Sequence, residues 1–229
     1  MKRSLILPCV FCLLAGLLVG GILPIPWEVS PTSNTILRTP ASSSSSDVSV
    51  FSNAAPEPLD SKDNLSLLNA ACYVVQALKN EDYEAVASVV DPEKGVTFTP
   101  YSTVDLTSDK TFTRNQIKNL SQDNTVYTWG LTDGRGSLIN MTMGQYFATY
   151  VWNTDYTNAP QIGVDQIIMS GNALENLKDA YQSYRFVDFC FPSLDPAKQG
   201  LDWCSLKLVF APGDTSWYLV GIVHGQWTI

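Results

Sequence analysis

The sequence has little positive charge and only one histidine. Its 229 residues include 14 Lys and Arg against 22 Asp and Glu, and the formal net charge is −8 at pH 7. Nucleic acids are bound by clustered Lys and Arg that neutralise phosphates, yet the one adjacent basic pair is Lys2–Arg3. We therefore expect no nucleic-acid partner.

The sequence also lacks the common catalytic and metal-binding motifs. It contains no HExxH, no GxSxG and, beyond residue 27, no CxxC pair, which argues against zinc sites and α/β-hydrolases. The run Asp133-Gly134-Arg135-Gly136 has neither the full ligand set of a calcium loop nor the Gly-Lys-Ser/Thr of a phosphate loop, so we interpret it as a hairpin turn. We predict no metal and no cofactor, and a binding protein rather than an enzyme.

The N-terminal region is apolar and carries no charge between residues 5 and 26. A helix over this stretch would be about 33 Å long, enough to cross the hydrocarbon core of a bilayer. Lys2–Arg3 before it and Trp27 after it resemble cytoplasmic charges and an interfacial aromatic residue. We predict that residues 1–27 form a cell-membrane anchor, with the rest of the chain outside the cytoplasm. The alternative is a signal peptide cleaved near Gly20-Gly21, and hence secretion.

Residues 28–62 have the composition of a linker. They contain four prolines and the five serines of residues 42–46, and such a segment buries too little apolar surface to offset chain entropy. We predict a disordered spacer here, followed by one folded domain over residues 63–229.

Three cysteines fall in the predicted domain. Cys190 and Cys204 lie in two predicted strands joined by a loop, so a disulfide across the hairpin and a pair of free core thiols both stay open. Cys72 lies on the apolar stripe of a predicted helix, and we expect it to be a buried free thiol.

Helix signals occupy the first two thirds of the domain. Apolar residues recur every three or four positions from Asp63 onward, which predicts a buried helix that ends at residues 79–81. The stripe is wide and consists of Leu65, Leu68, Cys72 and Val75, with Leu67, Ala71, Val74 and Leu78 beside them. Asp82 is a suitable cap for a short helix over 83–90. Further helix starts are indicated at Thr113 with Gln116, Thr142 with Gln145, and Asn172 with Glu175.

Strand signals dominate the end of the domain. Aromatic and β-branched residues are concentrated in three segments, residues 186–191, 203–210 and 217–227. Pro212-Gly213-Asp214 predicts a hairpin between the last two, and a further strand over 126–130 leads into the turn at Asp133-Gly134. Helices early and long strands late predict an α+β fold, with N-terminal helices packed on a curled antiparallel sheet.

The two ends of the domain resemble NTF2-like proteins. The run VVQALKNEDYEAVASVVDPEKG, which ends at Gly95, is similar to the opening helices of that superfamily, and LVFAPGDTSWYLVGIVHGQWTI is similar to its closing hairpin. With DPEKGVTFTPY, YTWG and a G-N-x-L segment, the domain also resembles a family of uncharacterised exported bacterial proteins. The resemblance implies an NTF2-like cone with an extended middle over residues 107–172. Because the superfamily includes isomerases, dehydratases and non-catalytic modules, it implies no single function.

His224 is the only histidine and a candidate general base. Strict alternation along its strand places it on one face with Tyr218 and Gln226, opposite Trp217, Leu219, Val223 and Trp227. If that face lines a pocket, His224 is positioned for proton transfer. Otherwise it is a surface or hydrogen-bonded structural residue.

Asp188, within an apolar strand, is the second acid–base candidate. A carboxyl group in apolar surroundings has a raised pKa, and the NTF2-like resemblance implies an acid of this kind inside the cone. Alternation leaves either side of the sheet open to Asp188. The alternative is a solvated charge or an ion pair with Arg185 or Lys207.

The middle of the domain is rich in aromatic residues. Aromatic side chains line ligand pockets and also fill hydrophobic cores, and both roles stay open. The candidate binding residues are Tyr101, Tyr127, Trp129, Arg185 and Tyr218.

Three functions are consistent with the sequence. The first is a membrane-tethered extracytoplasmic module that binds a small ligand, a peptide or an envelope polymer. The second is a small-molecule enzyme of isomerase or hydrolase type that uses Asp188 or His224 in a cone pocket. The third is a structural subunit that forms a homodimer through its sheet. We favour the binding module because the sequence contains no catalytic constellation.

Overall fold

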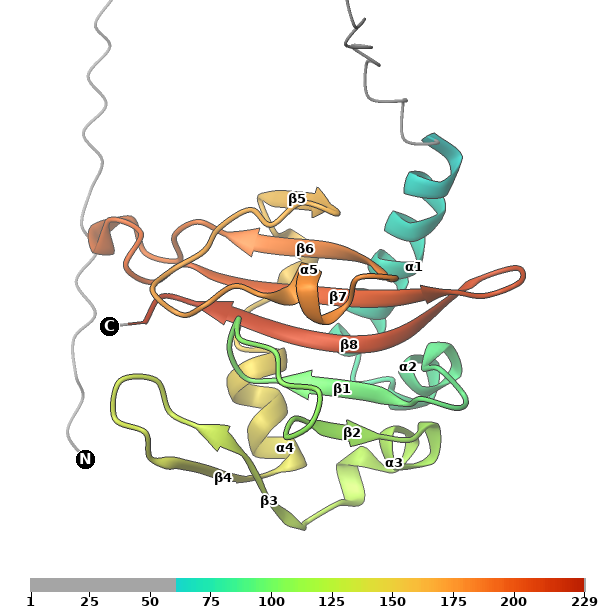
Figure 1. Cartoon of the computed structure of the whole chain (residues 1–229), viewed down its shortest axis with the longest axis horizontal. Coiled ribbons are helices and arrows are strands. Elements are labelled where there is room, and N and C mark those ends of the chain that lie inside the picture. Colours follow the sequence, from blue (N-terminus) through green and yellow to red (C-terminus); the bar gives the residue numbers. More distant parts are fainter. Residues whose placement is uncertain (1–60, 229) are drawn as a thin grey trace, which may run out of the picture. The chain divides into compact units, whose positions relative to one another are not determined.

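The computed structural model describes residues 61–228, which belong to one compact unit (Figure 1). Its helices and single turns are α1 (Ser61–Lys79), α2 (Tyr83–Val89), α3 (Arg114–Lys118), η1 (Leu120–Gln122), α4 (Met143–Tyr146), η2 (Phe147–Val151), η3 (Tyr156–Asn158), α5 (Leu177–Ala180) and η4 (Pro196–Lys198). Its strands are β1 (Val96–Thr99), β2 (Lys110–Phe112), β3 (Val126–Leu131), β4 (Leu138–Thr142), β5 (Gln161–Val164), β6 (Arg185–Phe191), β7 (Cys204–Pro212) and β8 (Trp217–Gln226).

The prediction of a membrane-spanning helix is corrected by the structure. Among residues 61–228, no helix is both long enough and apolar enough to cross a bilayer. The segment over residues 1–27, on which the anchor and the alternative signal peptide were placed, lies outside the described residues. So do residues 28–60 of the predicted spacer. A single-pass location in the cell membrane therefore has no helix to support it in the described structure.

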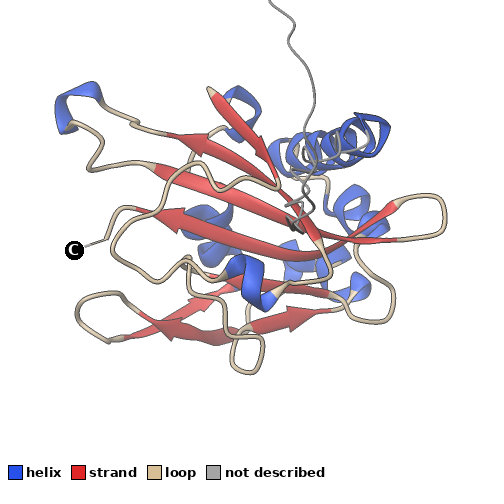
Figure 2. Ribbon diagram, turned by 45° about the horizontal axis from the view of Figure 1, so that its top comes forward, coloured by secondary structure: helices blue, strands red, loops and turns tan. Residues whose placement is uncertain are grey.

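The larger sheet has six strands in the order β2-β1-β8-β7-β6-β5, and β3 pairs with β4 in a separate two-stranded sheet. All neighbours are antiparallel except β1 and β8, which run parallel. This parallel pair departs from the predicted antiparallel sheet. The β7–β8 hairpin fixes the direction of β8, and in that direction β8 runs parallel to its other neighbour, β1. The prediction of an α+β fold with a curled sheet is confirmed (Figure 2).

Both faces of the larger sheet are covered. The inner face packs against α1, α2 and α4 through Val187, Phe189, Leu206, Leu208 and Ile222. The outer face packs against α5 and the chain before it through Phe186, Val209, Val220 and Val223. In Figure 1, α4 lies behind the sheet and α5 lies in front of it. Side chains on both faces of the central strands β6 and β7 are therefore almost all buried.

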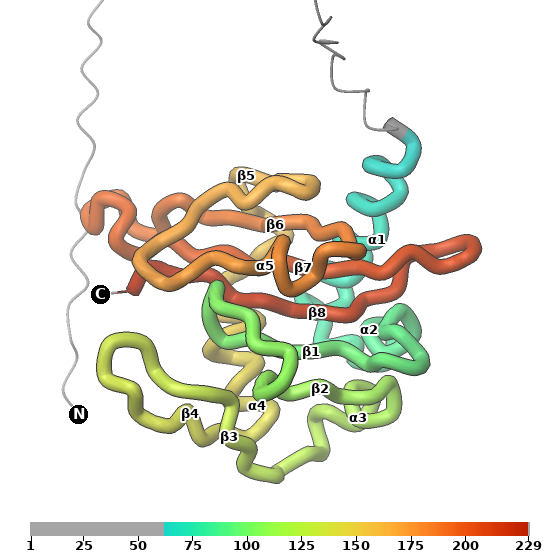
Figure 3. The backbone as a smooth tube through the Cα atoms, in the orientation of Figure 1, coloured from blue at the N-terminus to red at the C-terminus, as the bar shows by residue number. Residues whose placement is uncertain are grey.

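Residues 165–176, which we call the strap, connect β5 to α5 across the outer face (Figure 3). The strap begins at Asp165, a non-glycine residue in the left-handed region at φ 52°. Asp165 accepts hydrogen bonds from Arg185 Nε at 2.8 Å and from the Phe186 N–H at 3.0 Å. At its other end, Asn176 Oδ1 accepts from the Val104 N–H at 2.7 Å. The strap is thus fixed at both ends.

α1 buries a stripe slightly rotated from the predicted one. Leu65 is 59% exposed and Cys72 is also exposed, so the expectation of a buried Cys72 thiol was wrong. Apolar residues flank the predicted stripe on both sides, which leaves more than one orientation compatible with the pattern. The residues that enter the core are Leu67, Ala71, Val74, Val75 and Leu78.

Three predicted helix starts are confirmed by their capping contacts. Asp82 Oδ1 accepts a hydrogen bond from the Ala85 N–H at 2.9 Å at the start of α2. Thr113 and Thr142 each form a complete capping box, with α3 and α4 respectively. In each case a side-chain oxygen pairs with an N–H of the first turn that has no partner within the helix.

α5 begins later than the sequence indicated. Asn172, the predicted cap, instead donates through Nδ2 to the Thr228 carbonyl oxygen at 3.2 Å. The helix starts at Leu177 with Asn176 at the N-cap position. Tertiary contacts of the strap therefore override the local capping signal.

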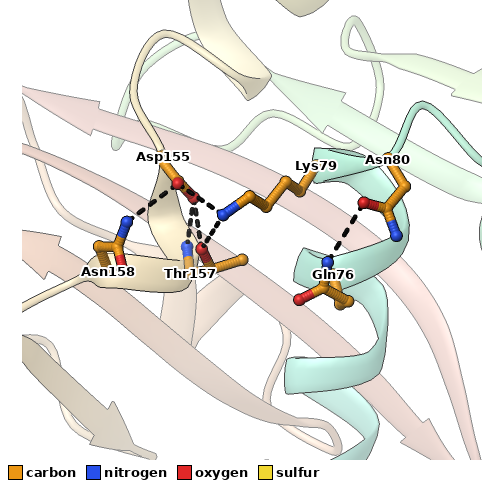
Figure 4. A network of polar contacts seen from close by, with 6 residues as sticks. All are labelled: Gln76, Lys79, Asn80, Asp155, Thr157 and Asn158. Carbon is orange, nitrogen blue, oxygen red and sulfur yellow. Dashed lines mark hydrogen bonds and ion pairs between the residues drawn. The ribbon is translucent and has the colours of Figure 1, made fainter.

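The C-terminal end of α1 is tied to the chain that precedes β5 (Figure 4). Lys79 Nζ donates to Asp155 Oδ2 at 2.8 Å and to Thr157 Oγ1 at 3.0 Å. The two ionic side chains remain 42% and 38% exposed. An ion pair this exposed contributes up to about 1 kcal/mol, so it mainly positions η3 against the helix.

Cys190 and Cys204 are buried free thiols, so of the two alternatives left open by the sequence the structure has the pair of core thiols and not the disulfide. The β6–β7 register pairs Cys190 with Ser205 and Cys204 with Phe191. Directly paired residues share a face and successive residues alternate, so the two thiols point to opposite sides of the sheet. The sequence places the cysteines in neighbouring strands but does not reveal this register.

Candidate functional site

A groove of about 440 Å³ lies between the chain after β1 and the turn that joins β3 to β4. Its walls come from residues 100–109, residues 129–136 and Ala173 of the strap. Pockets that hold drug-sized ligands have volumes of about 300–1,000 Å³. The groove is therefore large enough for a small ligand or a short chain segment.

Two of the predicted binding residues, Tyr101 and Trp129, line this groove. Trp129 is only 1% exposed, stacks on Tyr146 with ring centroids 3.7 Å apart, and donates through Nε1 to the Met141 carbonyl oxygen at 2.9 Å. Tyr101 is half-buried and packs edge-on against Tyr150 at 5.8 Å. Trp129 is thus a core residue at the groove wall, and Tyr101 is the more accessible of the two.

Three carboxylates, Asp105, Asp109 and Asp133, line the groove, and its lining includes no Lys, Arg or His. Asp109 Oδ2 accepts from Thr99 Oγ1 at 2.6 Å and from the Asp105 N–H at 3.0 Å, while burial raises the pKa of Asp109. Hydrogen bonds, above all from the Thr107 hydroxyl, lower the pKa of Asp105. The lining therefore favours neutral or positively charged groups over anions.

The β3–β4 turn forms one wall and confirms the predicted hairpin turn at Asp133-Gly134. Gly134 and Gly136 have φ values of 73° and 63°, in the region that favours glycine. A Cβ at either position would meet no atom within 4 Å. Glycine is thus required here by backbone conformation, and the wall leaves open space beside it.

His224 lies on the inner face of β8 and outside the groove lining. It is 1% exposed, its Nε2 lies 3.1 Å from Gln226 Oε1, and its ring packs edge-on against Tyr150 at 5.7 Å. Burial lowers the pKa of His224 to about 4. The imidazole is therefore neutral at pH 7 and has no access to solvent.

The strand faces predicted around His224 were right after Val220 but wrong before it, because β8 contains a bulge there. The β7–β8 register shifts between Val209 and Phe210, which leaves Val220 as an extra residue between Leu219 and Gly221. Alternation reverses at a bulge of this kind. Leu219, predicted to lie opposite His224, therefore joins it on the inner face, with Ile222.

Asp188 is fully buried on the outer face of β6 and does not line the groove. Its Oδ2 accepts from the Ile168 N–H at 2.9 Å, and its Oδ1 has no hydrogen-bond partner among the described residues. Lys207, also fully buried, lies directly opposite on β7. Burial raises the pKa of Asp188, and the Lys207 ammonium partly opposes that effect. Lys207 forms its ion pair with Glu175 and Arg185 forms one with Asp165, so Asp188 is a buried carboxyl group rather than a solvated charge or the partner in either ion pair.

The remaining candidate binding residues lie elsewhere on the domain. Tyr127 donates to Asp123 Oδ2 at 2.8 Å, and Arg185 forms an ion pair with Asp165 at 2.6 Å. Tyr218 is half-buried in β8. None of the three lines the groove, so the five predicted binding residues do not form one site.

Sequence reasoning missed the acidic part of the groove. Asp105 and Asp109 follow β1 in a segment without a recognisable motif, and they reach the β3–β4 turn only through tertiary folding. It also missed Glu175, whose carboxylate approaches Lys207 beneath the strap. A lysine inside the apolar run of β7 was the available signal, since a buried lysine needs an anionic partner.

Comparisons with known proteins identify few similar proteins. No family model and no curated protein matches the chain. One solved structure that matches is the crystal structure of a Xanthomonas campestris protein described as a calcium/calmodulin dependent protein kinase II association domain. It is 13% identical, with 76% of this chain and 91% of that chain covered and a TM-score of 0.30.

Proposed function

We propose that the protein is a non-catalytic binding module that holds a neutral or positively charged ligand in the groove beside the β3–β4 turn. The observation that carries the proposal is the lining, in which three carboxylates and the Tyr101 ring face a groove without basic side chains. A small ligand, a peptide and an envelope polymer are all compatible with its size.

We also propose the finer fold, an NTF2-like cone with an extended middle, and membership of the exported bacterial family that the sequence resembles. Helices α1 and α2 followed by a curled sheet that closes with the β7–β8 hairpin support the cone. The middle, residues 107–172, supplies β3, β4 and their turn, and thus one wall of the groove.

The two alternative functions have weaker support. Acid–base catalysis by Asp188 or His224 requires contact with a substrate, whereas both side chains are at most 1% exposed and neither lines the groove. A dimer formed through the sheet requires an exposed apolar face, whereas α5 and the strap cover the outer face. Burial of these residues therefore favours the binding module.

The proposal is tested by a thermal-shift screen against neutral, cationic and anionic oligosaccharides and short peptides. A ligand that binds the folded state raises the melting temperature by mass action. We expect neutral or cationic probes to give shifts and anionic probes to give none. Shifts confined to anionic probes would contradict the proposed site.

A matched pair of variants locates the binding site. Leu131 and Leu138 are cross-strand partners, 56% and 60% exposed, but only Leu131 lines the groove. Leu131→Arg places a cation at the groove, so we expect at least a tenfold loss of affinity for a cationic probe, while Leu138→Arg retains wild-type affinity. Equal effects of the two substitutions would show that the probe binds elsewhere.

A further inference from the structure

A cluster of polar side chains lies buried between the outer face of the sheet and the strap. Lys207 and Ser205 project from β7, Asp188 projects from β6, and Glu175 comes from the strap. Lys207, Asp188 and Ser205 are fully buried, and the Glu175 side chain is 12% exposed. Replacing buried ion pairs by apolar residues is often neutral or stabilising, so stability alone is a weak explanation for this cluster.

The Lys207 amine is held against one carboxyl group. Its Nζ lies 3.1 Å from Glu175 Oε2 and 3.2 Å from Ser205 Oγ. Glu175 Oε1 accepts from the Leu177 N–H at 3.2 Å, and Oε2 has no partner other than Lys207 among the described residues. A Cβ at position Gly225 would lie 2.8 Å from the amine nitrogen, so glycine there leaves room for it.

We propose that Lys207 and Glu175 condense to an amide bond that joins the strap covalently to β7. The 3.1 Å contact between Nζ and Oε2 holds the amine against the carboxyl group that contains Cδ, and holding two reacting groups together in this way lowers the barrier to their reaction. The neighbouring carboxyl group of Asp188 is the proton relay for this step.

The step balances without an oxidant or a co-reactant. The ammonium of Lys207 gives up a proton to Asp188, which passes its own proton on to the carboxylate of Glu175 and so ends unchanged, and the resulting amine forms an N–C bond to Cδ. The bond between Cδ and Oε2 breaks, and Oε2 leaves as water with two protons, the relayed one and one from the amine. The third proton stays on the amide nitrogen, and Oε1 becomes the amide oxygen, still paired with the Leu177 N–H.

Asp188 is suited to relay protons within the cluster. Burial raises its pKa and so favours its protonated form, and it lies directly across the strand pair from Lys207, whose amine donates to the Ser205 hydroxyl. Oδ1 of Asp188 has no hydrogen-bond partner in the described chain. Asp188 thus holds a proton beside the reacting pair, as a general acid must.

The same chain contains two ion pairs that serve as internal controls. Lys118 lies 2.6 Å from Glu84, and Lys79 lies 2.8 Å from Asp155, both closer than the buried pair. All four side chains are at least 38% exposed, so water solvates the charges and competes with condensation. We expect both control pairs to stay unlinked.

The experiment is mass spectrometry of tryptic fragments from the full chain purified in its folded state. Trypsin does not cleave after an acylated lysine, so the expected product is residues 136–178 linked to residues 199–229, lighter by one water molecule than the sum of the two. Free fragments that end at Lys207 in the folded protein, or a water loss mapped to another pair, would overturn the proposal.

Two variants separate chemistry from folding. Lys207→Met removes the nucleophile and must abolish the linked fragment. Asp188→Asn keeps both reacting groups and the shape of the relay but removes its acid, and we expect at least a tenfold smaller linked fraction in freshly prepared protein. Circular dichroism confirms that each variant is folded. An unchanged linked fraction in folded Asp188→Asn would contradict the relay.

Discussion

At the scale of single residues, the chain uses burial to control charge. Fully buried Asp188 has a raised pKa and fully buried His224 a lowered one, because both lose hydration in their charged forms. The two effects have opposite consequences for the pH dependence of stability. A histidine that stays neutral when folded resists protonation, whereas a buried carboxyl group binds its proton more tightly than it does in the unfolded chain.

His224 makes the folded state less stable as the pH falls. An unfolded histidine titrates near pH 6.5, whereas burial lowers the folded pKa to about 4. Between these two values the unfolded chain binds more protons, so the free energy of unfolding decreases by roughly 3 kcal/mol on acidification. Urea denaturation at several pH values between 7 and 4 measures this loss.

The control is His224→Gln, which keeps a polar side chain that does not titrate. Asp188 acts in the opposite direction in both proteins, so the difference between their pH profiles isolates the histidine. We expect a much flatter profile for the variant. Parallel profiles for wild type and variant would show that His224 is protonated equally in the two states.

At the scale of helices and strands, the sequence predicted the features that depend on contacts between residues close together in the chain. The caps at Asp82, Thr113 and Thr142 were predicted because each places a side-chain acceptor beside the first turn of its own helix. The bulge at Val220 was not, because it depends on how β8 pairs with β7. Likewise, the sequence around Asn172 is typical of a helix cap, but its side chain instead donates to the Thr228 carbonyl oxygen and holds the strap in place.

The capping boxes predict a measurable loss when their threonines are removed. In Thr113→Ala and Thr142→Ala, an N–H of the first turn loses its side-chain acceptor, so we expect about 1 kcal/mol lower free energy of unfolding for each. Urea titration measures both. Thr149→Ala is the control, since its exposed hydroxyl donates to the Gln145 carbonyl within the helix turn, and it should cost less than half as much.

At the scale of the whole molecule, the candidate site is made by tertiary folding. Its walls come from the chain after β1, the β3–β4 turn and the strap, which are far apart in the sequence. The sequence predicted the aromatic candidates Tyr101 and Trp129 from composition and the turn from its glycines. The sequence could not show that Asp109 lines the same groove as Tyr101 and Trp129, because no periodic pattern links the segments that contain them.

The α+β class was predictable for the opposite reason. Helical periodicity in the first part of the domain and β-branched runs in the last part can be recognised without knowing how the elements pack. The fold class can therefore be predicted without knowledge of tertiary contacts. The burial of individual residues cannot be predicted in this way, because it depends on tertiary contacts. Lys207 and Asp188 are buried because the strap crosses the outer face of the sheet above them. This is why a polar cluster in the middle of the sheet was seen only as a pair of candidate charges.

The core assembled from residues 61–228 predicts where the chain can be shortened. Removing residues 1–60 leaves every buried residue of α1 in place, so we expect the same melting temperature as for the full chain. Starting at residue 83 instead deletes α1, whose Leu67, Val74 and Leu78 fill the inner face. The exposed inner face should then prevent cooperative unfolding, because burying such side chains is worth about 1.5–3 kcal/mol each. Differential scanning calorimetry of the three proteins decides the matter, and a cooperative transition in the shorter fragment would show that α1 lies outside the folding unit.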